Sequence, residues 1–252
     1  KNPEMLAYLN AENAYADAFM SPLKPLQEQV YEEIVGRIKQ DDASVPYLER
    51  GYWYYTRFET GKDYPIHARR KGTMDAPEEI LLDVNKMAEG KGYFSVGDWE
   101  TSQDNTLLAW AEDAVGRRQY TIKVKNLATG ETYSDEVPGV AANVVWADDN
   151  KTLFYVWNDP KTLLTTRVQK HVLGTAAKDD VVVYEEKDDS FYMGVGRTRD
   201  DKFLCIQLGS TVSSEFRCAP AADPKDFAVL APRARAVEYG ADHHDGRWVV
   251  HT

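Results

Sequence analysis

The first forty residues carry apolar side chains at helical spacing. Four of them recur every fourth residue and so share one face of a helix. They are Leu26, Val30, Ile34 and Ile38. An earlier helix start is indicated by Asn2 followed by Pro3, because Asn caps helix N-termini and Pro fits the first helical turn. Pro46 interrupts the helical pattern. We expect residues 1–43 to form an N-terminal helical segment whose apolar stripe faces a partner surface.

From residue 44 onward, short runs of β-branched and aromatic residues alternate with turn signals. Such runs are typical of β-strands, and no helix-length period separates them. They include residues 52–55, 122–124, 153–156, 181–184, 203–206 and 248–250. We therefore expect a mainly β region over residues 44–252.

A polar tight-turn pair comes directly before an apolar strand five times. The pairs begin at Arg50, Asp104, Asp149, Asp200 and Asp245. The separations between them are 54, 45, 51 and 45 residues. A unit of about 40–50 residues with roughly four short strands is typical of a β-propeller blade. Residues 44–252 would then hold about four blades and an unfinished fifth, so we expect a piece of a longer polypeptide.

Charge and composition exclude several classes of protein. The chain has 30 basic and 41 acidic residues, a net charge of −11, which argues against nucleic-acid binding. The longest stretch without a charged residue is residues 203–214, so no membrane span is expected. Cys205 and Cys218 are expected to be reduced thiols in a cytoplasmic protein. A periplasmic location stays open, because we expect the native N-terminus to lie upstream of Lys1.

No catalytic motif is evident. Ser95 lies in the nearest approach to Gly-x-Ser-x-Gly, the turn that exposes the nucleophile of an α/β-hydrolase, but Tyr93 replaces the first Gly. We expect no catalytic residue in this chain.

Gly194 and Gly196 do not begin a dinucleotide loop, because Arg199 replaces the third Gly and a strand follows. No cofactor is expected.

Two further clusters admit a functional and a structural interpretation. His243 and His244 could ligate a metal, but adjacent side chains of a strand or turn point apart, so we expect a polar turn and no metal site. The acidic run over residues 185–189 could attract a basic peptide, although such runs are more often solvated loops.

A series of segments carries a family resemblance. They are residues 9–13, 54–66, 80–85, 111–113, 117–120, 161–164, 171–175, 184–189 and 238–240. In order and spacing they resemble the oligopeptidase B (protease II) group of the prolyl oligopeptidase family of serine peptidases. The resemblance runs essentially from end to end.

The resemblance implies a fold and an activity. The fold is mainly β: a partial seven-bladed β-propeller preceded by the helical segment, with the family's C-terminal α/β-hydrolase domain absent from this chain. That domain would carry the Ser, His and Asp of the active site and would pack against the helices. The parent enzyme would have trypsin-like specificity and hydrolyse short basic peptides after Arg or Lys. The propeller would gate access, and this chain alone would be inactive.

One residue receives a specific role from the resemblance. Glu112 is expected to match the propeller-side carboxylate of a salt bridge to the hydrolase domain. The alternative is a local surface pair with Arg117 or Arg118, which would contribute little stability.

Two other functions stay open. The chain could be a stand-alone propeller that binds a partner without catalysis, because propellers serve many functions. It could also be a propeller enzyme acting on a carbohydrate through Asp148 or Asp149. The sequence does not decide between Arg and Lys, and it reports neither the substrate length limit nor the oligomeric state.

Overall fold

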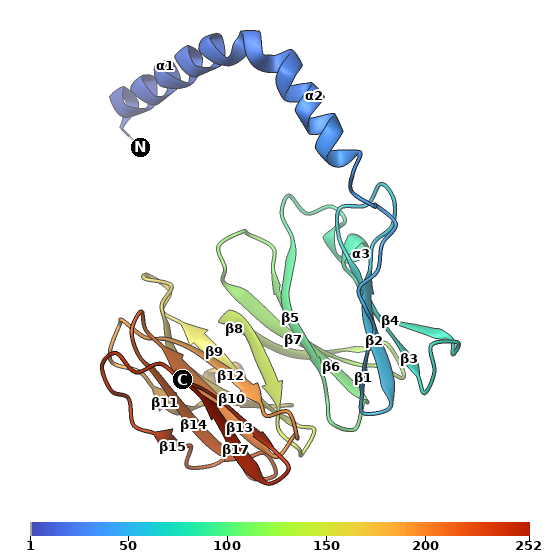
Figure 1. Cartoon of the computed structure of the whole chain (residues 1–252), viewed down its shortest axis with the longest axis vertical. Coiled ribbons are helices and arrows are strands. Elements are labelled where there is room, and N and C mark those ends of the chain that lie inside the picture. The colour runs from blue at the N-terminus through green and yellow to red at the C-terminus, as the bar shows by residue number, and fades with distance from the viewer. Residues whose placement is uncertain (1) are drawn as a thin grey trace.

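The computed structural model describes residues 2–252 and begins with a helical arm. The arm consists of α1 (Pro3–Met20), the short 3-10 turn η1 (Ser21–Leu23) and α2 (Lys24–Val35). Asn2 caps α1 as expected, because its side chain accepts the N–H of Glu4 at 2.9 Å. No residue of either helix is buried. Figure 1 shows the arm arching away from the strands, joined to them by a short linker.

The apolar stripe of the arm is open to solvent. Leu26, Val30 and Ile34 are exposed on α2, as is Ile38 just beyond it. The helix ends at Val35, earlier than the periodic pattern suggested. Among the residues described, none of the helices is long and apolar enough to span a membrane.

The strands form successive four-stranded antiparallel blades. Blade 1 comprises β1 (Tyr47–Glu49), β2 (Tyr52–Arg57), β3 (Ile66–Lys71) and β4 (Glu78–Asp83), followed by α3 (Val84–Ala88). Blade 2 comprises β5 (Ser95–Thr101), β6 (Leu107–Asp113), β7 (Tyr120–Asn126) and the first half of β8 (Thr132–Trp146). The strand β8 bends near Gly139, where φ is +73°, and its second half begins blade 3.

The later blades follow the same plan. Blade 3 continues with β9 (Thr152–Asn158), β10 (Thr165–Val172), η2 (Ala177–Asp179) and β11 (Val181–Glu185). Blade 4 comprises β12 (Tyr192–Arg197), β13 (Phe203–Gly209), β14 (Ser214–Pro220) and β15 (Ala228–Ala231). Two strands of a fifth blade follow, β16 (Gly240–His244) and β17 (Arg247–His251). The mainly β propeller predicted from the repeat is confirmed.

The repeat itself is a turn between the first and second strands of each blade. Each turn has one non-glycine residue with a positive φ, between 44° and 62°, and in the first and last turns a glycine with positive φ follows it. The non-glycine residues are Arg50, Asn105, Asn150, Asp201 and Asp245. Asn and Asp tolerate this left-handed conformation better than most residues, which explains the polar pairs at four of the five turns; Arg50 is the exception.

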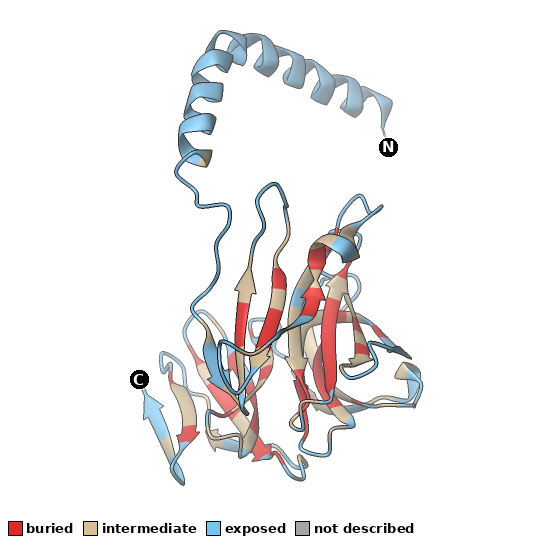
Figure 2. Ribbon diagram, turned by 90° about the vertical axis from the view of Figure 1, so that its right-hand side faces the viewer, coloured by how far each residue is buried: buried red, intermediate tan, exposed pale blue. Residues whose placement is uncertain are grey.

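Each hydrophobic cluster joins two neighbouring blades. Tyr54 and Leu82 of blade 1 pack with Trp110 of blade 2. Between blades 2 and 3, Ile122 packs in a cluster with Trp146, which is fully buried. Figure 2 shows the buried residues concentrated in the strands, while the arm is almost entirely exposed. The apolar faces of the blades therefore depend on their neighbours.

The first strands of the blades are the inner ones, and polar side chains tie them together. Asp98 of β5 accepts the N–H of Val144 of β8 at 2.9 Å. Asn143 of β8 in turn bonds both backbone groups of Val195 of β12, at 2.6 and 2.9 Å. Each tie connects the inner strand of one blade to the inner strand of the next, and these inner strands form no ladder with each other.

The two cysteines are joined, so the expectation of reduced thiols was wrong. Cys205 and Cys218 are direct cross-strand partners in β13 and β14, with their Cα atoms 4.1 Å apart. This pairing brings the sulfur atoms into bonding range. The sequence offered only two isolated cysteines, and their register became visible only in the sheet.

Gly97 provides a test of the close approach between inner strands. A Cβ atom at this position would lie 2.4 Å from the Cβ atom of Ala142 and 2.6 Å from Cε1 of Tyr120. We expect Gly97→Ala to lower the free energy of unfolding by about 1–3 kcal/mol, because both neighbours must move. Denaturant unfolding measures the change. Gly209→Ala is the matched control, since nothing lies within 4 Å of its added Cβ atom.

The disulfide predicts a stability that depends on redox conditions. It closes a loop with a sequence separation of 13 residues, for which chain entropy gives about 3 kcal/mol. We expect reductant to lower the unfolding free energy by about that amount. Reductant should have no effect on a Cys205→Ser/Cys218→Ser variant. Titration of two free thiols in the unfolded, unreduced protein would contradict the pairing.

Candidate functional site

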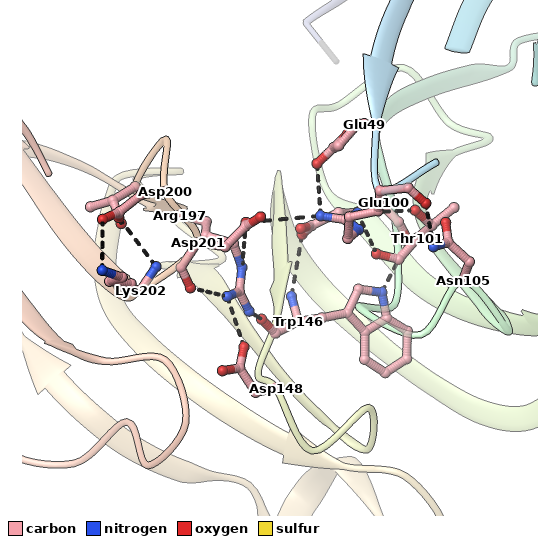
Figure 3. A network of polar contacts seen from close by, with 12 residues as sticks. Glu49, Glu100, Thr101, Asn105, Trp146, Asp148, Arg197, Asp200, Asp201 and Lys202 are labelled. Atoms are coloured by element: carbon pink, nitrogen blue, oxygen red, sulfur yellow. Dashed lines mark hydrogen bonds and ion pairs between the residues drawn. The ribbon is translucent and has the colours of Figure 1, made fainter. Parts of the chain in front are cut away.

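A network of charged side chains lies at the rim formed by the five repeat turns. Arg197 ends the inner strand β12 and is only 7% exposed. Its guanidinium donates to Asp148 Oδ1 at 2.8 Å, to the Trp146 carbonyl at 2.6 Å and to the Asp201 carbonyl at 2.8 Å. Figure 3 shows this group of contacts between the inner strands. Arg197 therefore connects blade 4 to blade 3.

Arg50 makes the corresponding connection from the first repeat turn. Its guanidinium lies 2.7 Å from Glu49 Oε1 and donates to Thr101 Oγ1 at 3.2 Å. The side chain is 15% exposed. This arginine therefore links blade 1 to blade 2.

Glu100, next to Thr101 at the end of β5, lies between the two arginines. Its Oε2 atom accepts the N–H of Trp146 at 3.2 Å. Burial raises the pKa of Glu100 to about 8, and the positive charges of Arg197 and Arg50 oppose this shift only in part. The network therefore contains a carboxyl group that titrates near neutral pH.

Sequence analysis missed this network. Glu100 and Arg197 each lie just before a repeat turn, so the available signal was a charged residue at the end of an inner strand, clearest for Arg197 because the rest of β12 is uncharged. The pairing of residues about 50 or 100 positions apart depends on how the blades stack.

The carboxylates considered for a carbohydrate enzyme have structural partners instead. Asp148 pairs with Arg197 at 2.8 Å. Asp149 accepts the N–H groups of Lys151 and Thr152 and the Thr152 hydroxyl. Burial alone would raise the pKa of Asp149, but these hydrogen bonds lower it. An acid held ionised in this way is poorly suited to donate a proton, so the carbohydrate interpretation gains no support.

Glu112 has local partners, but not the expected ones. Its carboxylate lies 3.1 Å from Lys123 Nζ and accepts the indole N–H of Trp110 at 2.7 Å. The side chain is 13% exposed. Arg117 and Arg118 form no ion pair with it among residues 2–252. The salt bridge to another domain stays a prediction.

The loop after Glu112 is organised by Asp113. This buried carboxylate accepts the backbone N–H groups of residues 115–118 at 2.8 to 3.0 Å. Burial opposes ionisation, but the four hydrogen bonds outweigh it and lower the pKa of Asp113. Arg117 and Arg118 are thereby presented to solvent on a loop of fixed shape.

The two histidines of the candidate metal cluster diverge. His243 is buried, and its Nδ1 atom lies 2.7 Å from Asp200 Oδ2. His244 is exposed beside Asp245. No group of three or more potential metal-ligating side chains occurs within the part of the chain that is described.

The remaining candidates also lie in structural positions. Ser95 stands opposite Asp113 in the β5–β6 ladder, not at a strand-to-helix turn. Within the acidic run, Glu186 is 8% exposed and pairs with Arg233 at 2.7 Å. Burial would raise the pKa of Glu186, but Arg233 and further hydrogen bonds lower it to about 2. This carboxylate belongs to a partly buried ion pair, so the run is not simply a solvated loop.

The raised pKa of Glu100 predicts pH-dependent stability. Because folding favours the protonated carboxyl, its contribution is fully present below about pH 4.5 and is lost as the pH rises towards 8. We expect Glu100→Gln to remain more stable than the wild type at pH 8 to 9, with the difference in melting temperature shrinking towards pH 5. The exposed Glu131→Gln is the control and should show no such trend. A constant difference between Glu100→Gln and wild type would contradict the shift.

Comparison with known proteins places the chain in a family. The family described as "Prolyl oligopeptidase, N-terminal beta-propeller domain" matches residues 1–252. A dipeptidyl aminopeptidase BI of Pseudoxanthomonas mexicana is 62% identical over 100% of the chain and 37% of its own length. Protease 2 of Moraxella lacunata is 31% identical over 100% of the chain and 37% of its own length.

A solved structure agrees with these relatives. Oligopeptidase B from Leishmania major matches 99% of the chain and 36% of its own length, with a TM-score of 0.89 and 31% identity. The chain thus spans little more than a third of the proteins it matches. With its whole length matched, the chain belongs to the prolyl oligopeptidase family, whose N-terminal β-propeller domain it resembles in sequence and fold.

Proposed function

We propose that this chain is the propeller part of a serine-type oligopeptidase that hydrolyses short peptides after Arg or Lys. The Ser, His and Asp of the active site would come from a C-terminal domain outside residues 1–252. The observation that carries the proposal is the match of 99% of the chain to 36% of oligopeptidase B from Leishmania major, at 31% identity. The propeller would restrict access to that domain and exclude folded proteins.

A second activity is favoured by one relative. The protein that is 62% identical is named a dipeptidyl aminopeptidase, whereas Protease 2 is 31% identical. Release of dipeptides from a free N-terminus is therefore the alternative specificity. Both activities use the same class of site, and they differ in whether the substrate needs a free amino group.

The helical arm supports an interface with a further domain. Its exposed stripe of Leu26, Val30 and Ile34 would leave water on contact with an apolar surface. Figure 1 shows open space between the arm and the blades, on the side away from the repeat turns. We propose that the C-terminal domain occupies that space and makes contact with the stripe.

The disulfide indicates the type of cellular compartment in which the protein resides. Disulfides persist in oxidising compartments and are rare in the cytoplasm. The bond between Cys205 and Cys218 therefore favours the periplasm over the cytoplasm expected from the sequence. We propose the periplasm. If cell fractionation finds the protein only together with cytoplasmic marker proteins, the periplasmic proposal is wrong.

Two fluorogenic peptides that differ only at the N-terminus test the activity. One is a blocked dipeptide amide ending in Arg, and the other has the same sequence with a free amino group. The protein that contains this chain should hydrolyse the blocked peptide, and an organophosphate that reacts with active-site serine should abolish the reaction. Substituting Gln for the Arg of the peptide should lower kcat/KM at least a hundredfold.

The purified 252-residue chain provides the control, and we expect it to hydrolyse neither peptide. Cleavage of the free-amine peptide alone would establish the dipeptidyl activity instead. If the longer protein cleaves neither peptide, the peptidase proposal fails and a binding propeller becomes the better interpretation.

A further inference from the structure

A groove lies between the outermost strand of blade 2 and the middle strands of blade 3. It is lined by residues of the first half of β8, in blade 2, and of β9, β10 and η2, in blade 3. Figure 1 shows these strands side by side. The groove has a volume of about 390 Å³, near the lower end of the range of about 300–1,000 Å³ for small-molecule sites.

Much of the lining is apolar. Tyr155 and Trp157 alternate along β9 and therefore share one face of the strand. Val137 and Pro138 of β8 contribute aliphatic surface. Next to them β8 bends at Gly139, where an added Cβ atom would lie 3.9 Å from the indole Nε1 of Trp157. An apolar ligand would lose contact with water on entering this groove.

Arg167 is fixed in the groove with part of its guanidinium unpaired. Its Nε atom donates to Glu185 Oε1 at 2.8 Å, and the guanidinium lies 5.0 Å from the centre of the Trp157 ring. Arg167 and Trp157 are cross-strand partners in the β9–β10 ladder, so strand register sets this stacking. The two Nη groups make no hydrogen bond to any of residues 2–252. They are available to a carboxylate, which accepts parallel N–H bonds from a guanidinium.

Two more donor side chains line the groove. Gln169 follows Arg167 on the same face of β10 and pairs with Tyr155 in the ladder. Lys178 is exposed on η2. Within the described part of the chain, neither Gln169 nor Lys178 makes a side-chain hydrogen bond or an ion pair. An anion in the groove could therefore accept bonds from three different side chains.

The groove is positively charged although the chain carries a net charge of −11. No acidic residue is among those that line it. Asp180 and Asp135, which lie nearby, both bond to His171, at 2.8 and 3.2 Å. Glu185 balances the charge of Arg167 alone, which leaves the charge of Lys178 uncompensated. The charge and the apolar lining together fit a ligand that has a carboxylate on an apolar body.

We propose that the groove between blades 2 and 3 binds a small organic acid. Arg167, Gln169 and Lys178 hold its carboxylate, and its apolar body packs against Trp157. The small volume favours a free acid over a peptide segment. The proposal does not depend on the peptidase function, because every residue that it uses belongs to the propeller.

Calorimetric titration of the longer protein with 3-phenylpropionate tests the ligand class. The matched probe is 3-phenylpropanamide, which keeps the ring and the chain length but has no charge. We expect the acid to bind and the amide to bind at least tenfold more weakly, because hydrogen bonds to an ionised acceptor are the stronger ones. Equal affinities, or no binding of the acid at millimolar concentration, would overturn the proposal.

Substitutions test the place of binding. We expect Lys178→Met and Arg167→Met each to weaken binding of 3-phenylpropionate at least fivefold. Lys202→Met is the control, because it removes the same charge from a side chain that is 61% exposed on a turn of blade 4, and it should change the affinity less than twofold. Unchanged affinity in both groove variants would show that the acid binds elsewhere and would overturn the assignment.

A peptide with a free C-terminus tests the size of the ligand. N-acetyl-Gly-Gly-Phe carries the same ring and carboxylate at the end of a longer chain. We expect it to bind more weakly than 3-phenylpropionate. Tighter binding that is lost in Lys178→Met would assign the groove to the C-terminus of a peptide and overturn the proposal of a small acid.

Discussion

The architecture depends on how successive inner strands are held together without a shared ladder. The second half of β8 pairs only with β9, and β12 lies at the edge of its sheet, so the inward-facing backbone groups of both have no strand partner. Side chains supply the missing bonds instead. Asp98 and Asn143 reach the backbone of the next inner strand, as does Glu100. Buried backbone groups must be paired, and these ties allow the blades to stack closely enough to bury their apolar faces.

Close stacking has consequences at the two rims. At the turn-bearing rim, short turns bring charged side chains from several blades within ion-pair distance. In these pairs the arginine is largely buried, whereas its acidic partner is 40–45% exposed. At the opposite rim, longer loops separate the strands, and Asp113 fixes one of them through four backbone hydrogen bonds. The turn-bearing rim is thus held by ion pairs between blades, whereas this loop of the opposite rim is held by hydrogen bonds within itself.

The arm and blade 4 differ in what stabilises them. The arm buries none of its residues, so its apolar stripe is stable only against a surface that residues 2–252 do not provide. Blade 4 instead gains a covalent link between neighbouring strands, next to the aromatic cluster with Trp248 of the fifth blade.

The net charge of −11 is compatible with basic peptides as substrates, but several acidic groups singled out in the sequence, such as Glu186, are already paired.

Sequence alone determined the helical start at Asn2, six of the strand runs and the five turns, because these depend on local conformational preference. The repeat spacing also gave the propeller, since blade length is a property of consecutive residues. The sequence could not show that Cys205 faces Cys218, that Glu112 contacts Lys123, or that Arg50 approaches Asp201. Those contacts depend on strand register and blade stacking. Side chains far apart in the chain meet only once the buried faces have fixed where each blade lies.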